Sequence, residues 1–142
     1  MSPSNDSPTT GIVTRRVEWI DTDASGHHHH SLVLRLVEAA EARALDDVGL
    51  LELYFAAAPR VRHEVDYEAP LRFGQETTCR IVLEAIGRTS MTWSFEVWGE
   101  AHGGQPRRRA ASGRVVCVHV PAGHEKATAW PDAVRATLRP RA

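Results

Sequence analysis

Residues 17–45, VEWIDTDASGHHHHSLVLRLVEAAEARAL, decide the fold because a strand-like pattern gives way here to a helical one. From about His28 to Val48, apolar residues recur every three or four positions, which predicts an amphipathic helix. This apolar stripe consists of Val33, Leu36, Val37, Ala40, Ala44 and Val48. Gly49 follows, and glycine is well suited to end a helix because it adopts a left-handed backbone at low cost.

Strand patterns lie on both sides of this helix. Residues 11–20 place Val13, Val17 and Trp19 at alternating positions, which predicts a strand. Further strands are predicted at residues 60–68, 76–86, 90–99 and 110–120. The last of these is apolar on both faces, as expected of a central strand. A short terminal helix is expected within WPDAVRATL (130–138), with Pro131 near its first turn.

The order of these elements is strand, long helix, then four strands, which predicts an α+β domain with the helix packed against one sheet. One helix covers only part of such a sheet. A second subunit is the simplest cover for the remaining apolar surface, so we expect a homo-oligomer.

Length and composition limit the class of protein. The chain has 142 residues, of which 42% are apolar and 25% charged, as in a one-domain globular protein. The formal net charge of −1 predicts no general attraction to nucleic acid or to a membrane surface. No apolar run approaches the roughly 18 residues of a transmembrane helix. We expect a disordered tail at residues 1–10, one domain at 11–138 and a short tail at 139–142.

The N-terminal residues and the cysteines bear on location. MSPSNDSPTT (1–10) has neither the basic nor the apolar region of a secretory signal. Cys79 and Cys117 do not form a CxxC pair, so we expect reduced thiols in a cytoplasmic protein.

Two aspartates are candidate catalytic residues because they stand where the first strand ends and the helix begins. Asp21 and Asp23 could serve only as caps of a turn, which is the common role of aspartate at such positions. The unpaired N–H groups at a helix N-terminus can, however, hold a developing negative charge. A carboxylate facing them could attack a carbonyl carbon or act as the base for water, and the residues leave both roles open.

The run His27–His30 admits three interpretations. In a helix, His27 and His30 would share a face, and in an extended segment alternate residues would, so at most two should converge. They could bind a metal together with Asp21 or Asp23, although no HExxH motif or Cys/His pair completes a site. They could form a solvated loop. We favour one or two histidines lining a pocket as proton carriers, and predict no metal.

Other polar features are weaker. Gly87-Arg88-Thr89-Ser90 is predicted to form a hairpin, where Arg88 could contact a phosphate or simply be solvated. Arg107, Arg108 and Arg109 allow the same two interpretations. His63 and His119 lie in apolar strand patterns and are predicted to be core or interface histidines with satisfied hydrogen bonds.

The segment 17–45 resembles the signature of hotdog-fold acyl-CoA thioesterases of the 4-hydroxybenzoyl-CoA thioesterase type: a strand, D-x-D, a small-residue turn ending in glycine, and the long helix. HEVDYEAPLRFGQE (63–76), GRTSMTWSFEVW (87–98) and AASGRVVCVHV (110–120) also resemble later strands of that family. The resemblance covers nearly all of residues 11–121. It implies a five-stranded antiparallel sheet wrapped around the helix, dimers or tetramers, and catalysis at a subunit interface without metal or cofactor.

Residue by residue, the resemblance implies that Asp23 is the nucleophile or general base. It places the backbone N–H that polarises the thioester carbonyl at or near His30, where a bacterial branch of the family often has histidine. The family's coenzyme A contacts fall on Arg88, Thr89 and Ser90. The pocket positions fall on Trp19, Gly26, His27, His28 and His29. Trp19 stands where the family often has tyrosine, and His27–His29 replace mostly apolar residues.

These observations predict an enzyme that hydrolyses an acyl thioester carried by coenzyme A or by an acyl carrier protein. A hotdog dehydratase acting on 3-hydroxyacyl thioesters is the alternative enzyme. A non-catalytic module that binds acyl thioesters or a metal is the alternative without catalysis. The sequence leaves the acyl group open.

Overall fold

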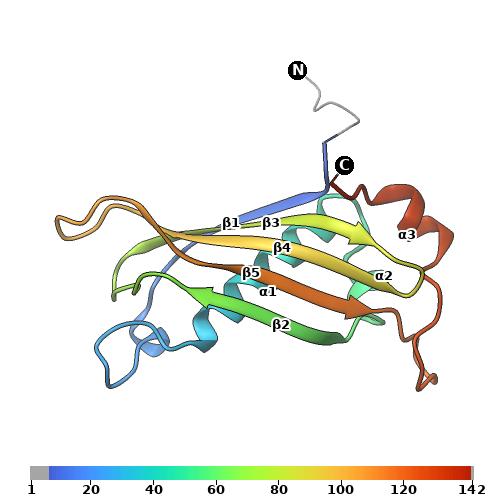
Figure 1. Cartoon of the computed structure of the whole chain (residues 1–142), viewed down its shortest axis with the longest axis horizontal. Helices are drawn as coiled ribbons and strands as arrows, with labels where there is room; N and C mark the ends of the chain where they lie inside the picture. The colour runs from blue at the N-terminus through green and yellow to red at the C-terminus, as the bar shows by residue number, and fades with distance from the viewer. Residues whose placement is uncertain (1–6, 142) are drawn as a thin grey trace.

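A computed structural model describes residues 7–141 and shows one five-stranded antiparallel sheet curved around a long helix (Figure 1). The strand order is β1–β3–β4–β5–β2, so β1 and β2 are the edge strands. The strands are β1 (Thr10–Arg16), β2 (Arg60–Tyr67), β3 (Glu76–Ile86), β4 (Ser90–Gly99) and β5 (Arg108–Val118). The helices are the 3₁₀ helix η1 (Trp19–Asp21), α1 (Ser31–Asp46), α2 (Leu51–Phe55) and α3 (Asp132–Thr137). The predicted α+β architecture is confirmed.

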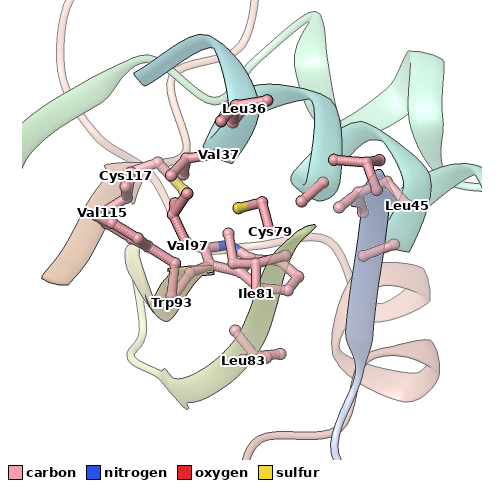
Figure 2. Packing of buried hydrophobic residues seen from close by; sticks show 14 of the residues in the cluster. Leu36, Val37, Leu45, Cys79, Ile81, Leu83, Trp93, Val97, Val115 and Cys117 are labelled. Carbon is pink, nitrogen blue, oxygen red and sulfur yellow. The ribbon is translucent and has the colours of Figure 1, made fainter. Parts of the chain in front are cut away.

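The core lies between α1 and the concave face of the sheet. Figure 2 shows Leu36 and Val37 of α1 opposite side chains of the central strands, among them Cys79, Trp93 and Val97. All of these side chains are buried, and each large one that leaves water stabilises the fold by about 1.5–3 kcal/mol. Both strands have the predicted bounds. Burial alternates along all of β4, whereas in β3 a register shift after Leu83 leaves Ala85 exposed.

The close approach of α1 to β1 depends on a glycine. A Cβ atom added at Gly11 would lie 2.0 Å from the carbonyl oxygen of Ala40 and 2.9 Å from the Cβ atom of Ala44. Only glycine on the strand and small residues on the helix allow the two backbones to come this near.

The ends of α1 differ from the prediction. The helix begins at Ser31 rather than near His28, because the main-chain N–H of His28 donates to the Leu71 carbonyl at 2.9 Å. It ends before Val48, which is 38% exposed and outside the buried stripe. Gly49 has the predicted left-handed backbone, with φ +76°. The short helix α2 follows it and was not predicted.

The first strand is shorter than the predicted segment 11–20. It ends at Arg16, and Trp19 lies on η1 instead of continuing the strand. The turn forms because the buried carboxylate of Asp21 accepts the Glu18 main-chain N–H at 2.8 Å.

The two histidines predicted to lie in the core or at an interface, His63 and His119, differ in burial. His63 is exposed on the edge strand β2, so it does not belong to the core of this chain, and its alternative place at a subunit interface stays a prediction. His119 is buried, and its Nδ1 lies 3.1 Å from Oγ1 of Thr128, as expected of a satisfied histidine.

A polar cluster crosses the core and ties α1 to the start of β2. Glu41 of α1 is fully buried and forms an ion pair with Arg60, and burial raises the pKa of this carboxyl group. The hydroxyl of Tyr54 donates to Glu41, and Nε1 of Trp93 donates to Tyr54 at 3.1 Å. Removing one partner would leave another buried and unpaired, which is costly.

The chain ends are joined beside β3. Thr9 donates its N–H to the Arg139 carbonyl at 2.9 Å, and the Arg141 N–H donates to Leu83 at 2.8 Å. Thr10 already belongs to β1, so the ordered fold extends beyond the predicted limits 11–138 at both ends. The rest of the predicted tails, residues 1–6 and 142, lies outside the described residues.

Two further observations concern the class of protein. No helix within residues 7–141 is long and apolar enough to cross a membrane. Cys79 and Cys117 are buried free thiols, and burial raises the pKa of each to about 12, so neither is reactive near neutral pH.

We predict that Gly11→Ala lowers the free energy of unfolding by about 1–3 kcal/mol, because the added methyl group forces β1 away from α1. Urea unfolding followed by tryptophan fluorescence measures the loss. Ile12→Ala is the matched control, since Ile12 is 51% exposed and should matter little. Equal small losses for both variants would contradict the proposed contact.

Candidate functional site

A cavity of about 460 Å³ opens beside the N-terminal end of α1, a size that suits a small-molecule site. Its lining residues are Asp23, His27, His28, His30, Tyr67, Glu68, Ala69 and Pro70. The first four come from the polar segment that the sequence singled out. The others come from the end of β2 and the loop after it, so the cavity joins two distant parts of the chain.

The polar segment is a closed turn. Gly26 has φ +87°, a backbone conformation that favours glycine, and its N–H donates to the Asp23 carbonyl at 3.0 Å. The Asp23 N–H donates in turn to the His27 carbonyl at 3.2 Å, and Thr22 forms a β-bridge with His28. Gly26 therefore shapes the turn without lining the cavity.

Asp23 presents an ionised carboxylate to the cavity. Its Oδ1 accepts hydrogen bonds from the Ser25 hydroxyl and from the Ser25 main-chain N–H, the latter at 2.8 Å. These two bonds hold the pKa of the Asp23 carboxyl below its usual value, and the bond from the Ser25 hydroxyl has the larger effect. Its Oδ2 makes no hydrogen bond within residues 7–141, so one oxygen is anchored and the other is available.

Asp21 has a different environment. Its carboxylate is buried and accepts from the Glu18 main-chain N–H at 2.8 Å and from Nη2 of Arg35 at 2.9 Å. It does not line the cavity. These contacts give Asp21 the role of a structural cap, which sequence reasoning had left open for both aspartates.

The main-chain N–H groups at the start of the helix differ in whether they have a hydrogen-bond acceptor. Ser31 donates to Nδ1 of His29 at 3.2 Å, and Leu32 donates to the His29 carbonyl at 3.0 Å. The His30 N–H, just before them, has no acceptor within residues 7–141. The His30 carbonyl accepts from the Tyr67 hydroxyl at 3.0 Å, which fixes this peptide against the end of β2. His30 thus offers a free donor at the positive end of the helix dipole.

His28 is the buried member of the histidine run. Its N–H donates to the Leu71 carbonyl at 2.9 Å, and its Nδ1 accepts the Leu71 N–H at 3.0 Å. Its ring stacks on Tyr67 with centroids 6.1 Å apart. Burial, followed by the charge of His27, lowers the pKa of His28.

The expectation that at most two histidines converge was wrong, because His27, His28 and His30 all line the cavity. The run is neither a regular helix nor a strand. His29 does not line the cavity and packs its ring on that of His30 at 4.0 Å.

The remaining predicted residues lie elsewhere in this chain. Trp19 is 74% exposed, contacts Phe73 edge-on at 5.7 Å and does not line the cavity. Arg88, Thr89 and Ser90 form the hairpin between β3 and β4, at the end of the sheet opposite the helix N-terminus (Figure 1). At about 3.3 Å per residue, the length of β3 separates them from Asp23 by roughly 30 Å.

Sequence reasoning missed Tyr67, Glu68, Ala69 and Pro70 as cavity residues. The sequence predicted only that Tyr67 and Glu68 end the strand at residues 60–68. No local signal says that this strand end meets the helix entrance. Within residues 7–141, no three or more His, Cys, Asp or Glu side chains form a group that could hold a metal ion.

Comparisons with known proteins agree with this architecture. The family model of the thioesterase-like superfamily matches residues 17–138. A thioesterase complexed with coenzyme A and Zn, from Thermus thermophilus, is 26% identical, with a TM-score of 0.76 over 90% of this chain and 91% of that chain. A predicted thioesterase from Bacillus stearothermophilus is 26% identical, with a TM-score of 0.75 over 91% of this chain and 93% of that chain.

A 4-hydroxybenzoyl-CoA thioesterase mutant complexed with 4-hydroxybenzoyl-CoA is 15% identical, with a TM-score of 0.79 over 92% of this chain and 99% of that chain. At this identity the likeness supports the fold alone. No curated protein matches the chain.

The family match spans α1, all the strands after it and α3, and the sheet wraps the helix as in the solved relatives. The chain belongs to the thioesterase-like superfamily and has the hotdog fold, which confirms the class of thioester hydrolase that its sequence predicted.

Proposed function

We propose that this protein hydrolyses an acyl-CoA thioester to the free acid and coenzyme A. One observation carries the proposal: the Asp23 carboxylate and the free His30 N–H belong to residues that line the same cavity at a helix N-terminus. Membership of the thioesterase-like superfamily supports the reaction class. Relatives whose names include coenzyme A support the carrier, with an acyl carrier protein as the alternative.

In the proposed reaction the thioester carbonyl oxygen accepts the His30 N–H. This donor stabilises the charge that develops on the oxygen, an effect worth about 100- to 1,000-fold in rate in well-studied enzymes. Oδ2 of Asp23 then acts in one of two ways. It attacks the carbonyl carbon, expels the thiolate and forms a mixed anhydride that water cleaves, or it takes a proton from a water that attacks directly. The lowered pKa of Asp23 keeps it ionised for either role.

We also propose that the active form is a homo-oligomer joined through β2. This strand is a sheet edge, and Val61 and Tyr67 on it are 60% and 49% exposed. Such an edge with apolar side chains is normally covered. A second copy covers it when the two β2 strands pair in an antiparallel manner about a two-fold axis.

Charge favours one register for this pairing. Residues directly opposite one another in an antiparallel pair point to the same face, so the axis must pass through a residue. An axis at His63 places Arg62 opposite the partner subunit's Glu64, which is an attractive pair made twice. An axis at Arg62 or at Glu64 would instead place like charges together.

The same pairing completes the site. The N-terminal end of β2 lies beside the C-terminal end of β5, which pairs with the start of β4 at Ser90. An antiparallel β2 pair therefore carries the partner's Arg88 hairpin to the cavity end of the first subunit. The hairpin leads into β4, which lies two strand spacings, about 10 Å, from β2 within the partner subunit. Arg88 is exposed and makes no ion pair within residues 7–141, which leaves it free for a coenzyme A phosphate.

Buried free thiols are compatible with a reducing compartment, and the proposal places the enzyme in the cytoplasm.

Asp23→Asn should lower thioester turnover by about 100- to 1,000-fold or more, a loss typical of a principal catalytic group. Release of free thiol from acyl-CoA measures it and also separates hydrolysis from dehydration, which forms an enoyl product without thiol. Asp21→Asn is the matched control. It should cost about 1.5–3 kcal/mol of stability through its buried bonds, with a much smaller loss of turnover. Equal small effects on turnover would refute the assignment of Asp23.

Turnover should survive extensive dialysis against a strong chelator, because the proposed chemistry needs only a carboxylate and helix N–H groups. Metal analysis and activity assays before and after dialysis test this. Stoichiometric zinc, with activity lost on removal and restored on return, would favour a metal site at the histidine run instead.

Mixing inactive Asp23→Asn subunits with Arg88→Ala subunits under exchange conditions should restore activity, because half of the sites in a mixed dimer then have both wild-type residues. Sedimentation at micromolar concentration should show a dimer or tetramer. Arg88→Ala alone should raise KM more than it lowers kcat, as expected of a remote phosphate contact. A fully active monomer would refute the shared site.

A further inference from the structure

We propose that His28 makes the enzyme selective for acyl groups that carry a hydrogen-bond-accepting oxygen, such as a hydroxyl, a ketone or a phenol. In this proposal the Nε2–H of His28 donates to that oxygen inside the cavity. The inference rests on the proposed thioesterase function, which it extends from a reaction class to a substrate class.

The main chain fixes the tautomer of His28. A backbone N–H can only donate, so the 3.0 Å bond from Leu71 requires an unprotonated Nδ1. A neutral imidazole then carries its proton on Nε2. Protonating Nδ1 would break the bond with Leu71 and leave that buried N–H unpaired, which is unfavourable. His28 is therefore held as a neutral donor rather than as an acid.

The donor atom is open to the cavity. The His28 side chain belongs to a residue that is only 9% exposed, yet it lines the cavity. No hydrogen bond of Nε2 is found within residues 7–141, and no fully buried side-chain nitrogen or oxygen there lacks a partner. The exposed part of His28 thus includes Nε2, and a ligand in the cavity can reach it.

The surroundings keep the ring neutral. Burial lowers the pKa of His28 most, and the neighbouring His27 and His29 lower it further, whereas Asp23 and the backbone hydrogen bond with Leu71 raise it. Tyr67 stacks on the ring, and Glu68 also lines the cavity. Since the net shift is downward, His28 stays an uncharged donor at neutral pH.

Position assigns this donor to the acyl group rather than to the thioester carbonyl. The carbonyl oxygen is held at the helix entrance by the His30 N–H. His28 is bonded instead to the segment after β2, whose Ala69 and Pro70 form the apolar wall of the cavity. A donor within an apolar wall discriminates well, because an acyl group without an acceptor leaves it unpaired.

The test compares matched thioesters: 3-hydroxybutanoyl-CoA with butanoyl-CoA, and 4-hydroxybenzoyl-CoA with benzoyl-CoA. In at least one pair, wild-type kcat/KM should favour the oxygenated member by about tenfold or more. The variant His28→Asn keeps an oxygen that accepts the Leu71 N–H but has no donor at the Nε2 position, so the preference should fall to about threefold or less. His28→Gln returns an N–H near that position and should restore part of it.

NMR of the ¹⁵N-histidine-labelled protein tests the tautomer independently of turnover, with His28→Asn used to assign the signal. The expected spectrum shows Nε2–H and unprotonated Nδ1 at pH 7. Adding 3-hydroxybutanoate or 4-hydroxybenzoate should shift the Nε2–H resonance more than butanoate or benzoate does.

Three results would overturn the proposal: no preference for an oxygenated member in either pair, a preference that His28→Asn retains, or an Nδ1–H tautomer. Absence of thiol release from all four thioesters would instead refute the proposed function. In that case the shifts caused by the free acids still decide whether His28 recognises the oxygen.

Discussion

The contact between α1 and β1 is the constraint on which the rest of the structure depends. Gly11 lets the strand backbone reach the helix at Ala40, and the buried stripe of α1 then lies along the concave face of the sheet. The helix cannot turn or slide without exposing that stripe. Its N-terminus is therefore fixed at one end of the sheet, where the chain arriving from β1 must make a tight turn.

That turn becomes a site because a second segment is bonded to it. His28 exchanges a main-chain and a side-chain hydrogen bond with Leu71, which brings the end of β2 to the helix entrance. The two aspartates then have separate roles. Asp21 is buried and holds the turn through Arg35, whereas Asp23 remains exposed, ionised and anchored by a single oxygen. A buried structural carboxylate and an exposed ionised one need different environments, and one short segment provides both.

The edge strand β2 connects the core to the proposed assembly. Arg60 at its start is paired with the fully buried Glu41, so the edge is anchored to α1 rather than loosely attached. Its other end borders the cavity. A two-fold axis through this strand would relate its two ends, so the proposed pairing through β2 would bring the Arg88 hairpin of one subunit to the Asp23 carboxylate of the other.

Much of this was determined by the sequence alone. Strand patterns gave the bounds of β3 and β4, and the apolar repeat located α1, because these are local patterns set by strand and helix periods. The resemblance of D-x-D and the following helix to a known family indicated Asp23, which lines the cavity. The tertiary structure decided what local patterns cannot express. It ended β1 at Arg16, selected His28 as the buried histidine, and added Tyr67 to Pro70 to the cavity, because each depends on hydrogen bonds between segments far apart in the chain. It also separated Arg88 from Asp23, since the length of β3 stands between them.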